Sequence, residues 1–179
     1  MRLSAVTGIL GFMPFAGEPA ADRTDAFGLA VDYFSWFGSV LLRRLEGLTF
    51  EQQTASVVPT GWSALGLLKH SAATRRFWIR HVFAGGDVDF TWPGSPELEW
   101  EVSSDDTAER IVGFFRFEHA HAVEVLRGGD PEDVAVRDYG SGVRPTLAWI
   151  LLHLLQDSAR HAGHLDISRE LTDGSTHLD

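Results

Sequence analysis

The stretch LLHLLQDSARHAGHLDI, residues 151–167, lies in a helical pattern that the sequence predicts from near Thr146 to about Thr172. A helix of this length extends about 40 Å at ~1.5 Å per residue. Its apolar positions include Ile150 and Leu154, so one side of the helix is expected to face a core. A long helix of this kind needs other amphipathic helices to cover its apolar side.

Three such helices are predicted upstream, over about 25–46, 60–83 and 104–126. In each of them apolar residues recur at steps of three and four, which is the period of an α-helix with one buried face. Ser104 is the expected N-cap of the third, because its hydroxyl would precede an acidic first turn.

The stretch VAVRDYGSGVRP, residues 134–145, predicts a short β-hairpin around residues 139–142. Four helices joined by one hairpin predict an all-α fold, a four-helix bundle over residues 25–174. Residues 1–24 are then an N-terminal arm, and residues 175–179 are a C-terminal tail.

Composition excludes several classes of function. The chain has 179 residues, of which 44% are hydrophobic and 22% charged, as in ordinary globular domains. Its 25 acidic and 15 basic side chains give a net charge of -10, which argues against a nucleic-acid-binding surface. The absence of cysteine excludes disulfides, thiolate metal sites and a cysteine nucleophile, so any metal must be held by nitrogen and oxygen ligands.

No apolar stretch reaches the ~18–20 residues of a membrane span, so no membrane association is expected. The N-terminus has an apolar run from Ala5 to Phe15, but Gly8, Gly11 and Pro14 interrupt it. This favours an arm that packs on the domain over a cleaved signal peptide, and a cytoplasmic location.

Polar side chains of metal-binding type share one face of the last helix. Asp157 and His161 are four residues apart and His164 follows three later, so all three stand above one another. One helix supplies only part of a coordination sphere. His70, in the middle of the second helix among apolar residues, is the candidate for the remainder, because an unpaired buried imidazole is costly.

Simpler interpretations remain open at this point. His70 can be a core histidine that hydrogen-bonds to a neighbouring side chain, and two histidines three residues apart occur often on solvated helix faces. A histidine cluster without any metal is therefore an alternative. Arg75, Arg144 and Arg160 could bind a substrate carboxylate, but each is expected to be an ordinary surface arginine.

Two motifs carry a resemblance to a known family. They are GWSALGLLKHSAATRRFWIRHVFAG at 61–85 and WILLHLLQDSARHAGHLDISREL at 149–171. Together they resemble the DinB-like superfamily, and most closely its branch around mycothiol-dependent maleylpyruvate isomerase, whose members are mostly uncharacterised. The resemblance covers about residues 25–174.

The resemblance implies a four-helix bundle that binds a divalent metal, often zinc or nickel, through three side chains. These fall on His70, Asp157 and His161. Relatives carry a histidine or glutamate where this chain has Asp157, and the shorter side chain puts that ligand in doubt. His164 is the alternative ligand, with Asp157 then holding an imidazole or a bound water.

The resemblance also implies chemistry with a low-molecular-weight thiol such as mycothiol, in S-transfer or isomerisation. The metal would lower the pKa of the thiol, and a small-molecule electrophile would be the second substrate. The alternative is a non-catalytic bundle that binds a metal or small ligand, or that serves as a dimerisation module. Self-association as a homodimer stays open in both interpretations.

Overall fold

The computed structural model describes residues 17–88 and 99–176, and within these ranges it contains five α-helices, one π-helix and no β-strand. The four predicted helices correspond to α1 (Ala26–Arg43), α3 (Ala64–Arg76), α4 (Ala108–Gly128) and α5 (Leu147–Asp173). Most of the predicted N-terminal arm, residues 1–16, and the end of the tail, 177–179, lie outside the described residues.

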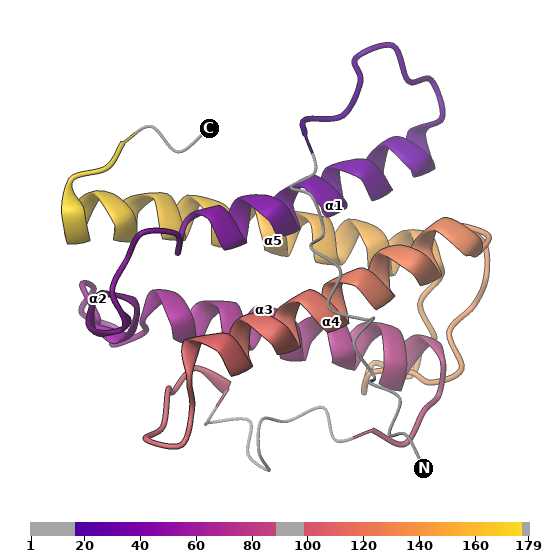
Figure 1. Cartoon of the computed structure of the whole chain (residues 1–179). Coiled ribbons are helices and arrows are strands. Elements are labelled where there is room, and N and C mark those ends of the chain that lie inside the picture. Colours follow the sequence, from indigo (N-terminus) through magenta and orange to yellow (C-terminus); the bar gives the residue numbers. More distant parts are fainter. Residues whose placement is uncertain (1–16, 89–98, 177–179) are drawn as a thin grey trace, which may run out of the picture.

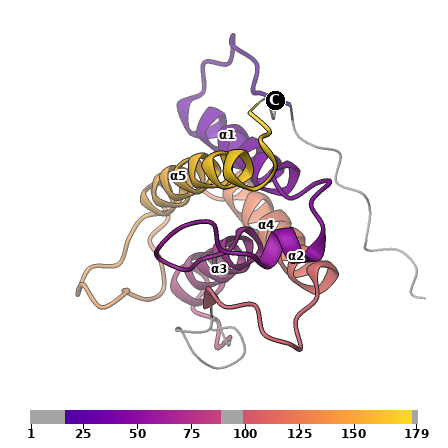
Figure 2. The same cartoon turned by 90° about the vertical axis from the view of Figure 1, so that its left-hand side faces the viewer.

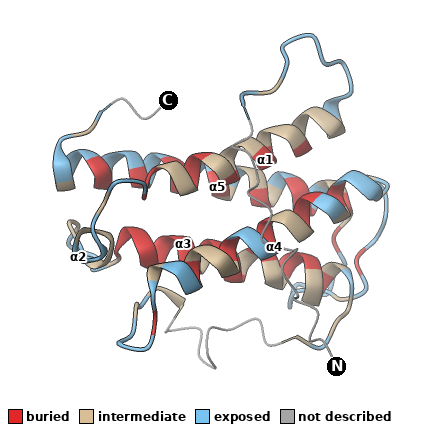
Figure 3. Cartoon of the chain, viewed as in Figure 1, coloured by how far each residue is buried: buried red, intermediate tan, exposed pale blue. Residues whose placement is uncertain are grey.

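The four long helices form the predicted bundle in two pairs (Figures 1 and 2). α1 packs along α5, and α3 packs along α4. The colours in Figure 1 show that α1 and α5 run in one direction and α3 and α4 in the other. Helices that are both consecutive and parallel, such as α3 and α4, need a long crossover connection between them. Buried residues lie mainly on the faces that the helices turn toward one another (Figure 3).

The core has two apolar clusters with a buried arginine between them. Phe34 belongs to one cluster and Phe115 to the other. The Arg75 guanidinium lies 5.1 Å from the centre of the Phe34 ring and 4.7 Å from that of Phe115. Cation–π contact with both rings allows a charged group to occupy the middle of the bundle. The expectation that Arg75 is a surface arginine is therefore wrong.

Hydrogen bonds satisfy this guanidinium. It donates to Nδ1 of His119 at 3.1 Å, to Oγ of Ser158 at 2.9 Å and to the Ser71 carbonyl at 2.7 Å. Burial lowers the pKa of Arg75 to about 10, so the group keeps its proton at neutral pH. Burial, together with the charge of Arg75, also lowers the pKa of His119 to about 3. The core therefore holds a neutral histidine beside a cationic arginine.

The low pKa of His119 predicts a loss of stability in acid. The unfolded chain takes up a proton near pH 6.5, whereas the folded chain does not until about pH 3. Below pH 6.5 protonation thus favours unfolding, by up to ~1.4 kcal/mol for each pH unit. We expect His119→Gln, which keeps an acceptor for Arg75, to be less stable at pH 7 but to lose less stability than the natural chain between pH 7 and 5. Urea titrations at each pH measure the difference, and equal slopes for the two proteins would contradict the buried neutral histidine.

Gly38 makes room for the same imidazole. A Cβ atom at Gly38 would lie 2.1 Å from Nε2 of His119, whose ring is held between Phe34 and Phe115. We expect Gly38→Ala to lower the free energy of unfolding by about 1–3 kcal/mol, because the ring cannot move away. The matched control is Gly113→Ala in α4, where a Cβ meets nothing within 4 Å. This control should gain ~0.5–1 kcal/mol from helix propensity.

The start of one helix and the presence of another differ from the prediction. α4 begins at Ala108 rather than near Ser104, and its N-cap is Thr107, whose side chain accepts from the Arg110 backbone N–H. The reason is that Asp106 does not sit in the first turn of the helix; it is buried and bound to Lys69. A short helix, α2 (Phe50–Thr54), was not predicted. Its five residues are too few to show a hydrophobic period.

The predicted hairpin at 134–145 forms only at its base. Only an isolated antiparallel bridge joins Val134 to Thr146. The backbone N–H groups of Val136 and Arg137 donate instead to the carbonyls of Phe83 and Val82, at 3.0 Å each. These carbonyls belong to the last two residues of the π-helix η1 (Phe77–Phe83), which continues α3. At its base the segment pairs with itself, since the Ala135 N–H donates to the Pro145 carbonyl at 2.9 Å, and beyond the base it pairs with the free carbonyls of a helix end.

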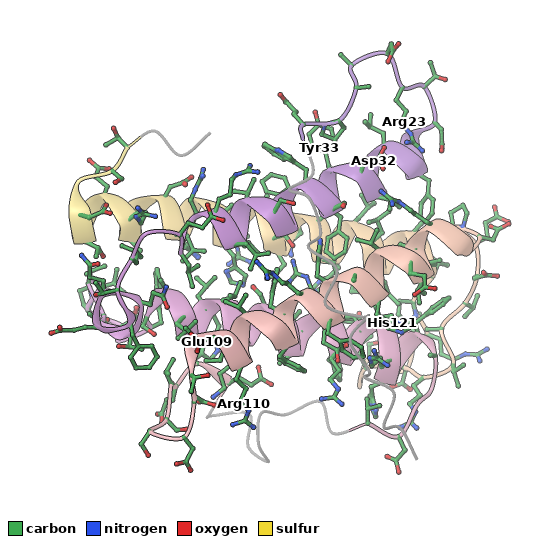
Figure 4. The ribbon with its side chains drawn as sticks, viewed as in Figure 1. Arg23, Asp32, Tyr33, Glu109, Arg110 and His121 are labelled. Atoms are coloured by element: carbon green, nitrogen blue, oxygen red, sulfur yellow. The ribbon has the colours of Figure 1, made fainter. Side chains whose placement is uncertain are left out.

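Ion pairs on the outer surface connect α1 with the segment before it and with α4. Asp32 of α1 pairs with Arg23 and, at 3.3 Å, with Arg127 of α4. Figure 4 shows Arg23 and Asp32 together at the N-terminal end of α1. Such exposed pairs contribute little to stability.

Among the described residues, no helix combines the length and apolar character that crossing a membrane requires.

Candidate metal centre between α3 and α5

The structure brings together three of the predicted site residues. His70 lies in the middle of α3, and Asp157 and His161 lie one turn apart in the middle of α5. The rings of His70 and His161 have centroids 5.5 Å apart and are nearly perpendicular. Nε2 of His161 is 3.3 Å from Oδ1 of Asp157. The α-helical repeat therefore places both α5 side chains opposite His70, as their spacing predicts.

The polar atoms of this cluster are poorly satisfied by the protein. The side chains of His161 and Asp157 are 7% and 15% exposed. Both ring nitrogens of His161 and Oδ2 of Asp157 are buried without a well-aligned hydrogen-bond partner. Leaving a buried polar group unpaired costs about 1–3 kcal/mol. Three such atoms in one place make this cluster a candidate binding site.

The charges of the cluster suit a cation. Burial acts to raise the pKa of Asp157, but contact with His161 and the charge of Arg75 outweigh burial and hold the pKa below its ordinary value. Asp157 is therefore a carboxylate at neutral pH. Glu99 adds a second carboxylate near His70, and Arg75 is the buried positive charge on the core side. Two carboxylates against one guanidinium leave an excess of negative charge for a bound cation.

His164 lies next to His161 but on the solvent side of it. It is exposed on α5, with its ring centroid 5.8 Å from that of His161 and 5.9 Å from that of Trp62. The structure thus places Asp157, rather than His164, in the interior beside the His70–His161 pair.

Two residues that sequence reasoning missed enclose His70. Oε2 of Glu99 is 3.1 Å from Nδ1 of His70. The indole of Trp100 stacks on the imidazole at 3.9 Å, with the planes 18° apart. Both belong to the connection before α4, which has no hydrophobic period and carries no signal of where it packs.

A cavity of about 480 Å³ adjoins the cluster. It is lined by Thr60, Gly61, Trp62, Trp100 and Glu101. Trp100 links the two, because it lines the cavity and its indole stacks on the imidazole of His70. Arg144 and Arg160, the other arginines considered for a substrate, are exposed and do not line this cavity.

Comparison with known families gives a match over most of the chain. The model of the mycothiol-S-transferase family matches residues 31–174, from the first helix of the bundle to the end of the last. The chain belongs to the mycothiol-S-transferase family. This confirms the predicted relationship to the DinB-like, mycothiol-using proteins, and it suggests a mycothiol-dependent S-transferase with mycothiol as cosubstrate. No curated protein sequence matches the chain.

In this mycothiol-S-transferase family member, the donor groups of the cluster are of the kinds that bind a divalent ion. Imidazole nitrogens and a carboxylate are ordinary zinc ligands, and the chain has no cysteine to compete. Two imidazoles that bind one zinc at ~2.0–2.1 Å have ring centroids roughly 5 Å apart, close to the separation of His70 and His161. As placed among the described residues, however, no three His, Asp, Glu or Cys side chains are arranged as ligands of one ion. Binding therefore requires side-chain rotation within the cluster.

Proposed function

We propose that this chain is a metal-dependent S-transferase that joins a low-molecular-weight thiol, mycothiol or a close analogue, to a small electrophile. His70, Asp157 and His161 would hold the metal. The observation that supports the proposal is the group of buried nitrogen and oxygen atoms on His161 and Asp157 that lack a well-aligned hydrogen-bond partner, together with a cavity whose wall includes Trp100, the residue stacked on His70. Membership of the family supports the choice of thiol.

The protein's own residues have separate tasks in this proposal. His70, Asp157 and His161 would hold the divalent ion, which when bound would lower the pKa of a thiol near it and so favour the thiolate at neutral pH. Trp62 and Trp100 offer flat apolar walls that orient the body of the cosubstrate. In the transfer the S–H bond breaks, a bond forms from sulfur to the electrophilic carbon, and the proton leaves with the departing group or to water. The chain has no cysteine, so the sulfur comes with the cosubstrate.

The experiment compares metal-stripped and metal-loaded protein. Protein stripped with a chelator and then given zinc or nickel is mixed with mycothiol and a fluorogenic haloalkyl electrophile. We expect thioether formation above the uncatalysed rate only with metal present, and faster with mycothiol than with glutathione. Equal rates with stripped protein, loaded protein and no protein would contradict the enzyme and leave a non-catalytic bundle.

A further inference from the structure

The structure shows a carboxylate that binds the ring nitrogen of a candidate ligand from outside the cluster. Glu99 Oε2 and His70 Nδ1 are 3.1 Å apart, and the side chain of Glu99 is 17% exposed. A carboxylate at this distance favours the tautomer with the proton on Nδ1, because only that tautomer donates to it. The lone pair of His70 then resides on Nε2.

The second nitrogen agrees with this assignment. The hydroxyl of Thr74, one turn further along α3, lies 3.4 Å from Nε2 of His70. A hydroxyl can donate a proton to a nitrogen lone pair, and its contact is long and therefore weak. Nε2 is thus an available acceptor that a stronger partner can take over.

The segment that carries Glu99 is fixed against α3. Lys69, the neighbour of His70, donates to the Glu101 carbonyl at 2.7 Å and pairs with Asp106 at 2.9 Å. The Trp100 carbonyl approaches α3 at Gly66, where a Cβ atom would lie only 2.2 Å from its oxygen. Trp100 also stacks on the imidazole. Glu99 is therefore held at His70 by contacts on its C-terminal side that do not depend on a bound ion.

From these contacts we propose that Glu99 is a positioning residue: it fixes the tautomer and ring orientation of His70, with Trp100 restraining the ring from its face. The proposal rests on the proposed metal site. A carboxylate that binds the far nitrogen of a metal-binding imidazole raises its basicity and orients it, and losing such a partner weakens metal binding by roughly 10–100-fold. Glu99 itself stays outside the set of metal ligands.

The test uses Glu99→Ala, Glu99→Gln and the exposed control Glu132→Ala. Nitrogen-15 NMR of metal-free protein assigns the His70 tautomer, and titration with zinc gives the dissociation constant. We expect the proton on Nδ1 in the natural chain and in Glu99→Gln, whose amide oxygen can still accept it. In Glu99→Ala we expect a tautomer mixture and zinc binding roughly 10–100-fold weaker. Glu132→Ala should match the natural chain in both measurements.

The outcomes separate this proposal from the metal site itself. If the natural chain binds no zinc, the metal site is wrong, and the tautomer still reports whether Glu99 orients His70. A proton on Nε2 in the natural chain, or an unchanged zinc affinity in Glu99→Ala, would overturn the positioning role. Urea unfolding of each variant identifies any loss that comes from misfolding. Gly66→Ala is the second variant; its Cβ displaces the Trp100 backbone while Glu99 is retained, and it should weaken zinc binding as Glu99→Ala does.

Discussion

Replacing His161 by alanine is expected to lower metal-dependent S-transfer by about 100-fold or more. The ring is the most deeply buried member of the cluster, and both its nitrogens lack a well-aligned partner within the protein. Removing it deletes one of three proposed ligands, a larger change than the loss of an outer partner, which alone costs roughly 10–100-fold. The initial rate of thioether formation, with metal and mycothiol in excess, measures the effect.

The control for this variant is His121→Ala. His121 lies on α4, whereas the cluster is formed by α3 and α5, and it lies 4.0 Å from the exposed carboxylate of Glu124. We expect this variant to react as fast as the natural chain. If His161→Ala kept its rate under the same conditions, the reaction would not use this cluster.

The second large effect concerns stability and the ion pair of Lys69 and Asp106. The two side chains are each 1% exposed and lie 2.9 Å apart. Replacing one partner leaves the other charge buried and unpaired, which lowers the free energy of unfolding by about 3–5 kcal/mol. We expect Lys69→Met and Asp106→Asn each to lower the free energy of unfolding by about this amount. The double variant Lys69→Met/Asp106→Leu should recover part of the loss.

The ion pair also has a pH signature. Burial acts to raise the pKa of Asp106, but hydrogen bonds from Lys69 and Ser103 outweigh it and lower the pKa. A carboxylate with a lowered pKa stabilises the fold above its unfolded value of ~3.9, and the contribution disappears as pH falls through the folded pKa. Urea unfolding at pH 7 measures the loss in each variant, and measurement below pH 4 should find the variants closer to the natural chain. A single variant as stable as the natural chain at pH 7 would show that the pair is not buried in solution.

The helices were predictable because each repeats apolar residues with the period of a buried helical face. The convergence of His70 on α5 was predictable for a related reason: an imidazole among apolar residues needs a partner, and Asp157 and His161 stand on one face at helical spacing. The family resemblance pointed to the same three positions. In the structure Asp157 is largely buried and His164 is exposed, which favours Asp157 as the third ligand, and the choice between them stays a prediction.

The remaining features depend on contacts between distant segments that leave no local pattern. Glu99 and Trp100 reach His70 from 29 and 30 positions away, in a connection with no hydrophobic period. Arginine side chains are usually exposed, but that of Arg75 lies in the core because Phe34 and Phe115 contact its guanidinium from two other helices. The predicted hairpin is limited to its base for the same kind of reason, since the backbone N–H groups of Val136 and Arg137 donate to carbonyls of η1.

The most direct test of the proposed metal centre is elemental analysis of the natural chain after expression with zinc and nickel supplied. We predict about one divalent ion per chain in the purified protein, and loss of most of it in His161→Ala. Metal no higher than the buffer background in the natural chain would mean that His70, Asp157 and His161 are not a metal site.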